Sequence, residues 1–181
     1  MSGGKFLIVT LLGLHCATGN AQDATVEMDI LNVQAGLLAF FVSYETKLGK
    51  ETSLRLETGL DNAWSGGFSG EEITVISPLL NIAPMWYYNL PKRASQGKSV
   101  AGNSGDFLAL RSVYYPSWFT GIRPQLTILP TWGMRRRFWD NFHYELGFAA
   151  GYRHRFYGDD SLTTRPGKAV WQLHLRLGYG F

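Results

Sequence analysis

The sequence predicts an all-β protein, an eight-stranded antiparallel up-and-down transmembrane β-barrel, and the C-terminal strand carries most of that prediction. Read backwards from the last residue in steps of two, this strand has large apolar groups on one face and glycine or polar groups on the other. The first face holds Trp171, Leu173, Leu175, Leu177, Tyr179 and Phe181, and the second holds Gln172, His174, Arg176, Gly178 and Gly180. A period of two places these sets on opposite sides of a sheet, and an apolar outside with a polar inside is typical of a membrane barrel. A soluble barrel or sandwich would show the same alternation with the faces exchanged.

The N-terminus predicts export across a membrane. Lys5 precedes an apolar run over residues 6–14, and small residues stand where cleavage after Ala21 requires them. We therefore expect residues 1–21 to be a signal peptide and residues 22–181 to form one barrel domain. The apolar run is too short for a transmembrane helix, which needs roughly 20 residues. An N-terminal anchor or a buried helix is the alternative.

The composition fits this class. Cleavage would leave 160 residues with a formal charge of +2 and no cysteine, because Cys16 lies in the expected signal peptide. A chain without thiols has no disulfide framework and no thiolate metal or nucleophile site. The mean hydropathy of −0.08 is close to neutral, as expected for a barrel in which half of each strand faces a polar interior.

The same alternation recurs along the chain and defines the other strands. Seven strands show it directly, and because single-chain bacterial barrels have even strand numbers, we expect an eighth near the N-terminus. Pro78 and Pro84 interrupt one ladder and predict bulges or an irregular edge there. The expected strands are 25–35, 38–47, 53–63, 73–88, 106–118, 123–133, 141–157 and 168–181.

Charge separates the two sets of connections. If the C-terminus lies in the periplasm, the connections 48–52, 89–105 and 134–140 lie on that side, with seven basic and two acidic residues and a net charge of +5. The opposite connections carry one basic and four acidic residues, a net charge of −3. Basic groups gain about 1 kcal/mol each near anionic headgroups. The alternative is that the three arginines 135–137 only solvate a turn.

Aromatic residues stand at the expected strand ends, as they do at membrane interfaces. At one end these are Trp86, Tyr87, Tyr88, Trp139 and Phe142, and at the other Trp64 and Trp118. A nucleic-acid partner is not expected for the same basic and aromatic mixture, because the protein is predicted to be exported.

Charged residues on the inward faces predict an interior network. They are Glu45, Arg55, Glu57, Asp61, Arg111, Glu145, Arg153 and Arg176. The interior of an eight-stranded barrel is only wide enough for its own side chains, and an unpaired buried charge is costly. We therefore expect the acids and arginines to pair and fill the interior; an ion path through the same groups is the alternative.

Several segments resemble those of a family of small, uncharacterised outer-membrane barrels of Gram-negative bacteria. They are Leu54 to Leu60, Trp86 to Arg93, Asn103 to Gly105, Trp132 to Arg136, Asn141 to Glu145 and Leu173 to Phe181. The predicted architecture is similar to that of the barrel domain of outer membrane protein A. The resemblance implies an outer-membrane location, contact with outer-membrane lipids and insertion by the barrel-assembly machinery. Outer-membrane barrels commonly end on an aromatic residue that this machinery recognises, which assigns Tyr179 and Phe181 as the assembly signal.

No catalytic or cofactor site is expected. Outer-membrane lipid A deacylases and palmitoyl transferases need a histidine near a serine nucleophile, and none of His143, His154 and His174 lies in the His-x-Ser-Asn pattern that such deacylases resemble. We expect His143 and His174 to face the interior as structural residues. The predicted function is a structural, adhesive or assembly-type role in the outer membrane. A narrow pore or a lipid-handling protein is the second alternative, and a soluble periplasmic barrel with an inward leucine face is the third.

Overall fold

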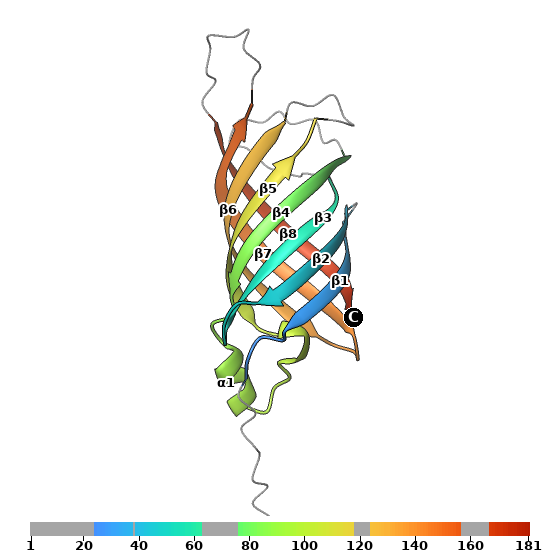
Figure 1. Ribbon diagram of the computed structural model, residues 1–181, viewed down its shortest axis with the longest axis vertical. Helices are drawn as coiled ribbons and strands as arrows, with labels where there is room; N and C mark the ends of the chain where they lie inside the picture. Colours follow the sequence, from blue (N-terminus) through green and yellow to red (C-terminus); the bar gives the residue numbers. More distant parts are fainter. Residues whose placement is uncertain (1–23, 38, 63–75, 118–123, 157–166) are drawn as a thin grey trace, which may run out of the picture.

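The computed structural model of the chain is a closed barrel of eight antiparallel strands in up-and-down order (Figure 1), which confirms the predicted all-β architecture. It describes residues 24–37, 39–62, 76–117, 124–156 and 167–181. The strands are β1 (Asp29–Gly36), β2 (Ala39–Lys47), β3 (Thr52–Asn62), β4 (Ile76–Trp86), β5 (Asp106–Tyr115), β6 (Gln125–Arg137), β7 (Phe142–Arg155) and β8 (Lys168–Gly180). The predicted signal peptide lies outside the described residues.

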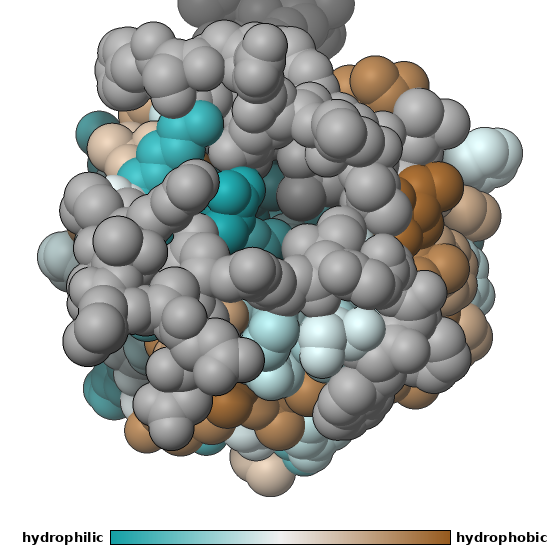
Figure 2. Space-filling model, turned by 90° about the horizontal axis from the view of Figure 1, so that it is seen from above, coloured by the Kyte–Doolittle hydropathy of each residue, from teal (hydrophilic) through white to brown (hydrophobic). Residues whose placement is uncertain are grey.

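Alternation along each strand sorts side chains between the inside and the outside of the barrel. On β8, Leu173, Leu175 and Leu177 are 57–60 % exposed, whereas Arg176 between them is 3 % exposed. Viewed along the barrel, hydrophilic residues are visible in the middle and hydrophobic residues lie around the outside (Figure 2). On β8 the leucines therefore face outward and Arg176 inward, which is the opposite of the inward leucine face that the third alternative requires.

The largest differences from the predicted strands are at β1 and β6. β1 begins at Asp29, four residues later than expected, because the residues before it cross under the barrel. β6 continues to Arg137, four residues beyond the predicted end. Its three final arginines thus belong to a strand and not to a solvated turn. Only 116–117 of the expected end of β5, and none of the expected start of β4 at 73–75, lie within the described residues.

The prolines of β4 do not produce the predicted bulges. β3 pairs with β4 in one unbroken register that includes Leu60 opposite Pro78 and Leu54 opposite Pro84. On the other side, the pairing with β5 stops after Ile82 and resumes at Met85 in the same register. Proline has no N–H to donate, so Pro84 leaves a gap in the ladder without an extra residue.

The lower end of the barrel, where α1 (Leu90–Ser95) lies in Figure 1, is closed by an apolar cluster. It comprises Val26, Ala83, Met85, Tyr87, Leu90, Phe107 and Ala109. Val26 comes from the segment before β1 and is held by a hydrogen bond from its N–H to the carbonyl of Lys50 (2.9 Å). The connection expected over 89–105 occupies 87–105 in the structure; it contains α1 and a short 3₁₀ turn (Ala101–Asn103), and part of it packs inside. No helix among the described residues is long and apolar enough to cross a membrane.

A second apolar cluster fills the interior nearer the upper end. It comprises Phe41, Leu79, Val113, Tyr115, Leu129, Ala149 and Val170. On β2, β5, β6 and β8 these residues lie above the buried charged residues Glu45, Arg111, Arg135 and Arg176. The interior therefore has an apolar cluster on each side of its main polar layer, with further buried polar residues, Asp61 and Arg153 among them, nearer the upper end.

Candidate functional site

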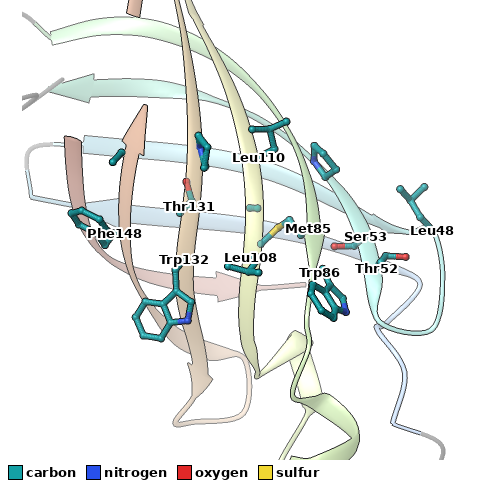
Figure 3. A pocket seen from close by; sticks show the side chains of 14 residues that line it. Leu48, Thr52, Ser53, Met85, Trp86, Leu108, Leu110, Thr131, Trp132 and Phe148 are labelled. Atoms are coloured by element: carbon teal, nitrogen blue, oxygen red, sulfur yellow. The ribbon is translucent and has the colours of Figure 1, made fainter. Parts of the chain in front are cut away.

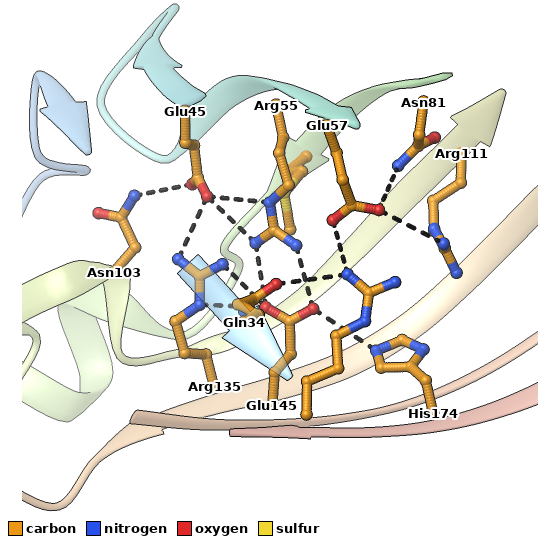
Figure 4. A network of polar contacts seen from close by, with 12 residues as sticks. Gln34, Glu45, Arg55, Glu57, Asn81, Asn103, Arg111, Arg135, Glu145 and His174 are labelled. Carbon is orange, nitrogen blue, oxygen red and sulfur yellow. Dashed lines mark hydrogen bonds and ion pairs between the residues drawn. The ribbon is translucent and has the colours of Figure 1, made fainter. Parts of the chain in front are cut away.

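The polar middle layer contains two carboxylates, Glu45 and Glu145, that share two arginines (Figure 4). Arg55 donates to Glu145 through both terminal nitrogens (3.0 and 3.1 Å) and to Glu45 through Nε and Nη2 (3.2 and 3.1 Å). Arg135 donates to Glu145 at 2.8 and 3.1 Å and to Glu45 at 3.2 Å. Arg135 and Glu45 are both 0 % exposed. Because two acids face two arginines, this part of the network is electrically balanced.

Neutral donors complete the shell of Glu45. The hydroxyls of Ser53 and Tyr87 and the side-chain amide of Asn103 each donate to its Oε1 at 2.8 Å. Asn103 reaches this position from the 3₁₀ turn, where its φ of 56° is the only positive value of a non-glycine residue among the described residues. Buried carboxylates are stable only when paired and hydrogen-bonded, and Glu45 meets both conditions.

Glu57 is the centre of the second half of the network. Arg176 donates to its Oε2 at 2.6 Å, Asn81 donates to its Oε1 at 3.3 Å, and Arg111 lies 3.8 Å from Oε1. The guanidinium of Arg176 also lies over the ring of Phe41, 3.7 Å from its centroid. This stacking joins the charged layer to the upper apolar cluster.

Two histidines face the interior, as expected, each packed against a glycine of the neighbouring strand. His174 Nε2 lies 3.5 Å from Glu145, and His143 Nε2 lies 3.0 Å from the side-chain nitrogen of Gln34. A Cβ on Gly147 would overlap the ring of His174, and one on Gly178 would overlap that of His143. The two glycines therefore provide the space that the rings occupy.

The network crosses the whole barrel. Every strand contributes at least one member: Gln34 from β1, Glu45 from β2, Arg55 and Glu57 from β3, Asn81 from β4, Arg111 from β5, Arg135 from β6, Glu145 from β7, and His174 and Arg176 from β8. Side chains are therefore linked from wall to wall at this level, between the two apolar clusters.

The structure brings six of the eight predicted network residues together: Glu45, Arg55, Glu57, Arg111, Glu145 and Arg176. Asp61 and Arg153 are also buried, each 6 % exposed, but lie nearer the upper end. Asp61 interacts with Gln172, which accepts a hydrogen bond from Arg111 at 2.9 Å.

The two residues predicted as the assembly signal lie on the outer face at the lower end. The ring of Tyr179 contacts those of Phe142 and Phe181 edge to face, with centroids 5.1 and 4.8 Å apart. The N–H of Phe181 donates to the carbonyl of Leu31 at 2.8 Å, which ties the C-terminus to β1.

Sequence reasoning missed Arg135, Tyr87 and Asn103. Arg135 was assigned to a periplasmic turn, and its burial lowers the net charge of that side from +5 to +4. The sequence did contain one indication that Arg135 faces inward: it follows the inward residues Thr131 and Gly133 in steps of two along the strand. Tyr87 was placed in the aromatic belt but is 0 % exposed. Trp64 and Trp118 of the expected opposite belt lie outside the described residues.

Comparisons with known proteins add no further constraint. The chain matches no protein-family model, and searches of curated proteins and of solved structures found no match. The architecture of an eight-stranded barrel is shown, while the resemblance to a family of outer-membrane barrels stays a prediction.

Proposed function

We propose that this protein is an exported outer-membrane barrel with a structural, adhesive or assembly-type role and a closed interior. The observation that carries the proposal is the combination of an apolar outer face with a charged network that crosses the inside. Soluble monomers rarely expose apolar patches larger than a few hundred Å². Here every strand carries outward leucine, isoleucine or phenylalanine side chains that are 36–60 % exposed, including Leu31 of β1 at 45 %. A bilayer would cover them.

The lower rim supports this placement. Trp86, Tyr88, Trp132, Trp139 and Phe142 lie on the outer surface near the end that carries α1. Trp132 Nε1 donates to the hydroxyl of Tyr88 at 2.9 Å, and Trp86 Nε1 donates to Glu51 at 3.1 Å. Aromatic side chains with one apolar and one hydrogen-bonding edge are characteristic of membrane interfaces.

A shallow groove on the outer face fits the same proposal. It encloses about 770 Å³, and its lining includes Pro84, beside a gap in the ladder with β5, and Pro130, beside a gap in the ladder with β7. Figure 3 shows Trp86, Leu108 and Trp132 along it. Its lining is largely apolar, as expected of a surface that contacts hydrocarbon. In this proposal outer-membrane lipids and the barrel-assembly machinery are the partners, and the protein has no catalytic role.

Fractionation and conductance test the proposal. The protein should be recovered in outer membranes, should begin near Gln22, and should migrate faster in gels before boiling than after it. In planar bilayers it should give no stepwise conductance, because the network closes the lumen. Recovery from the soluble periplasm would contradict the membrane placement, and stepwise ion conductance would favour the narrow pore.

A further inference from the structure

The connection between β4 and β5 carries an excess of positive charge at the lower end of the barrel. Residues 88–105 include Lys92, Arg93 and Lys98 and contain no aspartate or glutamate. Lys92 and Lys98 are exposed, and neither makes an ion pair within the part of the chain that the structure describes. Figure 1 shows α1, which carries Lys92 and Arg93, below the ends of the strands. A run of charges by itself indicates only a solvated surface, but the surroundings of α1 indicate more.

α1 is anchored to the barrel at its start. Leu90 is 0 % exposed and packs in the lower apolar cluster. The side-chain oxygen of Asn89 accepts a hydrogen bond of 2.7 Å from the N–H of Asp106, the first residue of β5. Nη2 of Arg93 donates to the carbonyl of Ser99 at 3.0 Å. The basic side chains of α1 therefore extend from an element with a fixed place on the barrel.

Arg93 lies beside the outer side of the barrel wall. Burial and the charge of Arg136 lower the pKa of Arg93, whereas Asp106 and Tyr144 act in the opposite direction, so all three residues lie within electrostatic range of it. Arg136 and Tyr144 are opposite each other on β6 and β7 and alternate with buried residues, so both face outward. Because Asp106 pairs with Arg136, Lys92 and Arg93 remain as a net positive charge at this place.

Aromatic side chains cover the outer face next to this charge. The ring centroid of Phe138 lies 6.3 Å from that of Tyr144 and 6.3 Å from that of Phe142. Phe138 and Trp139 are 57 and 70 % exposed. Exposed aromatic side chains mark the boundary between hydrocarbon and headgroups. The six residues of α1 span about 9 Å, comparable with a headgroup layer of roughly 5–8 Å on each side, so its cations lie at the depth of lipid phosphates.

We propose that Lys92 and Arg93 bind the headgroup of an anionic phospholipid in the leaflet at the lower end of the barrel. Its phosphate would accept hydrogen bonds from the two cationic side chains, and its acyl chains would pass Phe138 and Tyr144 toward the apolar outer face. An acidic polymer or protein below the membrane would also complement the charge, but it would leave the adjoining aromatic side chains unused. This inference rests on the proposed membrane location.

Lipid titration tests the proposal. The barrel, refolded in a neutral maltoside detergent, is titrated with phosphatidylglycerol or with phosphatidylcholine, which has the same phosphate but no net charge, and bound lipid is counted by native mass spectrometry. Each basic group near an anionic headgroup contributes about five-fold in affinity, so Lys92 and Arg93 together should give phosphatidylglycerol a preference of about 25-fold. Lys92→Gln should reduce this preference about five-fold. The matched control Lys168→Gln, at the opposite end of the barrel, should leave it unchanged.

Salt provides a second measurement on the unaltered chain. Raising the ammonium acetate concentration from about 0.05 M to about 0.5 M should weaken the preference, because salt screens exposed charges. Equal binding of the two lipids, a preference that salt does not change, or equal effects of Lys92→Gln and Lys168→Gln would overturn the proposal.

A polymer below the membrane gives a different result. Sedimentation of the detergent-solubilised barrel with purified peptidoglycan, abolished by Lys92→Gln and accompanied by no lipid preference, would overturn the lipid in favour of the polymer. Failure of the membrane proposal would appear separately, as recovery of the protein in the soluble fraction.

Discussion

Replacing Arg135 by methionine should destabilise the barrel far more than the same change at its neighbour Arg136. The guanidinium of Arg135 is fully buried and makes hydrogen bonds of 2.8–3.2 Å to two carboxylates, Glu45 and Glu145. Arg136 pairs with Asp106 at a site where both side chains are about one-fifth exposed. Methionine retains the unbranched stem, so the change mainly removes the charge and its donors.

The magnitudes follow from burial. Removing one partner of a buried ion pair costs about 3–5 kcal/mol, because the remaining charge loses compensation in a dry environment. An exposed pair contributes about 0–1 kcal/mol. Arg135→Met should therefore lower the free energy of unfolding by about 3–5 kcal/mol, and Arg136→Met by about 1 kcal/mol or less.

Urea unfolding of the refolded barrel in lipid vesicles, followed by tryptophan fluorescence, measures both values. Adding Glu145→Gln to Arg135→Met should cost less than the sum of the two single changes, which is the signature of coupling between contacting residues. If Arg135→Met costs no more than Arg136→Met and the double variant is additive, the interior is solvated. The network would then not close the lumen.

Four further variants test other parts of the structure. Leu146→Arg should cost about 2–4 kcal/mol if its outward site lies near the bilayer midplane, whereas Ala149→Arg, at a fully buried inward site, should fail through crowding in detergent and lipid alike; equal tolerance of both would argue against a membrane-spanning strand. Gly147→Ala should displace the ring of His174, seen as changed histidine resonances in NMR spectra, and an unchanged spectrum would contradict the packing. Tyr87→Phe should cost about 1.5–3 kcal/mol in urea unfolding, the value of a hydrogen bond to a charged group, and a neutral result would mean that its hydroxyl is not needed by the carboxylate.

The strands were predictable because a two-residue period with one buried face fixes both position and orientation. All eight expected strands overlap observed ones, and the buried acids and arginines, except Arg135, were found from the alternation along each strand. The alternation of side chains does not show where a strand ends. β6 continues through three arginines that locally read as a solvated turn, since only tertiary partners, Glu45 and Glu145, make burial of Arg135 favourable.

Contributions from outside the strands were beyond sequence reasoning. Asn103 enters the network from a turn after α1, and Val26 enters the lower cluster from the segment before β1. Neither position shows a period, so nothing in the local pattern distinguishes them from solvated loop residues. The prediction for Pro84 was correct in one part and wrong in the other. The ladder with β5 is interrupted there, as expected, but the register with β3 is unbroken, so there is no bulge.

A barrel whose interior is linked from wall to wall at Glu45, Glu145 and Glu57 should pass no solute along its axis. The same links should make the stability of the barrel depend on Arg135, which bridges Glu45 and Glu145. Absence of conductance and a large effect of Arg135→Met are therefore expected together, and a conducting barrel that tolerates Arg135→Met would contradict both.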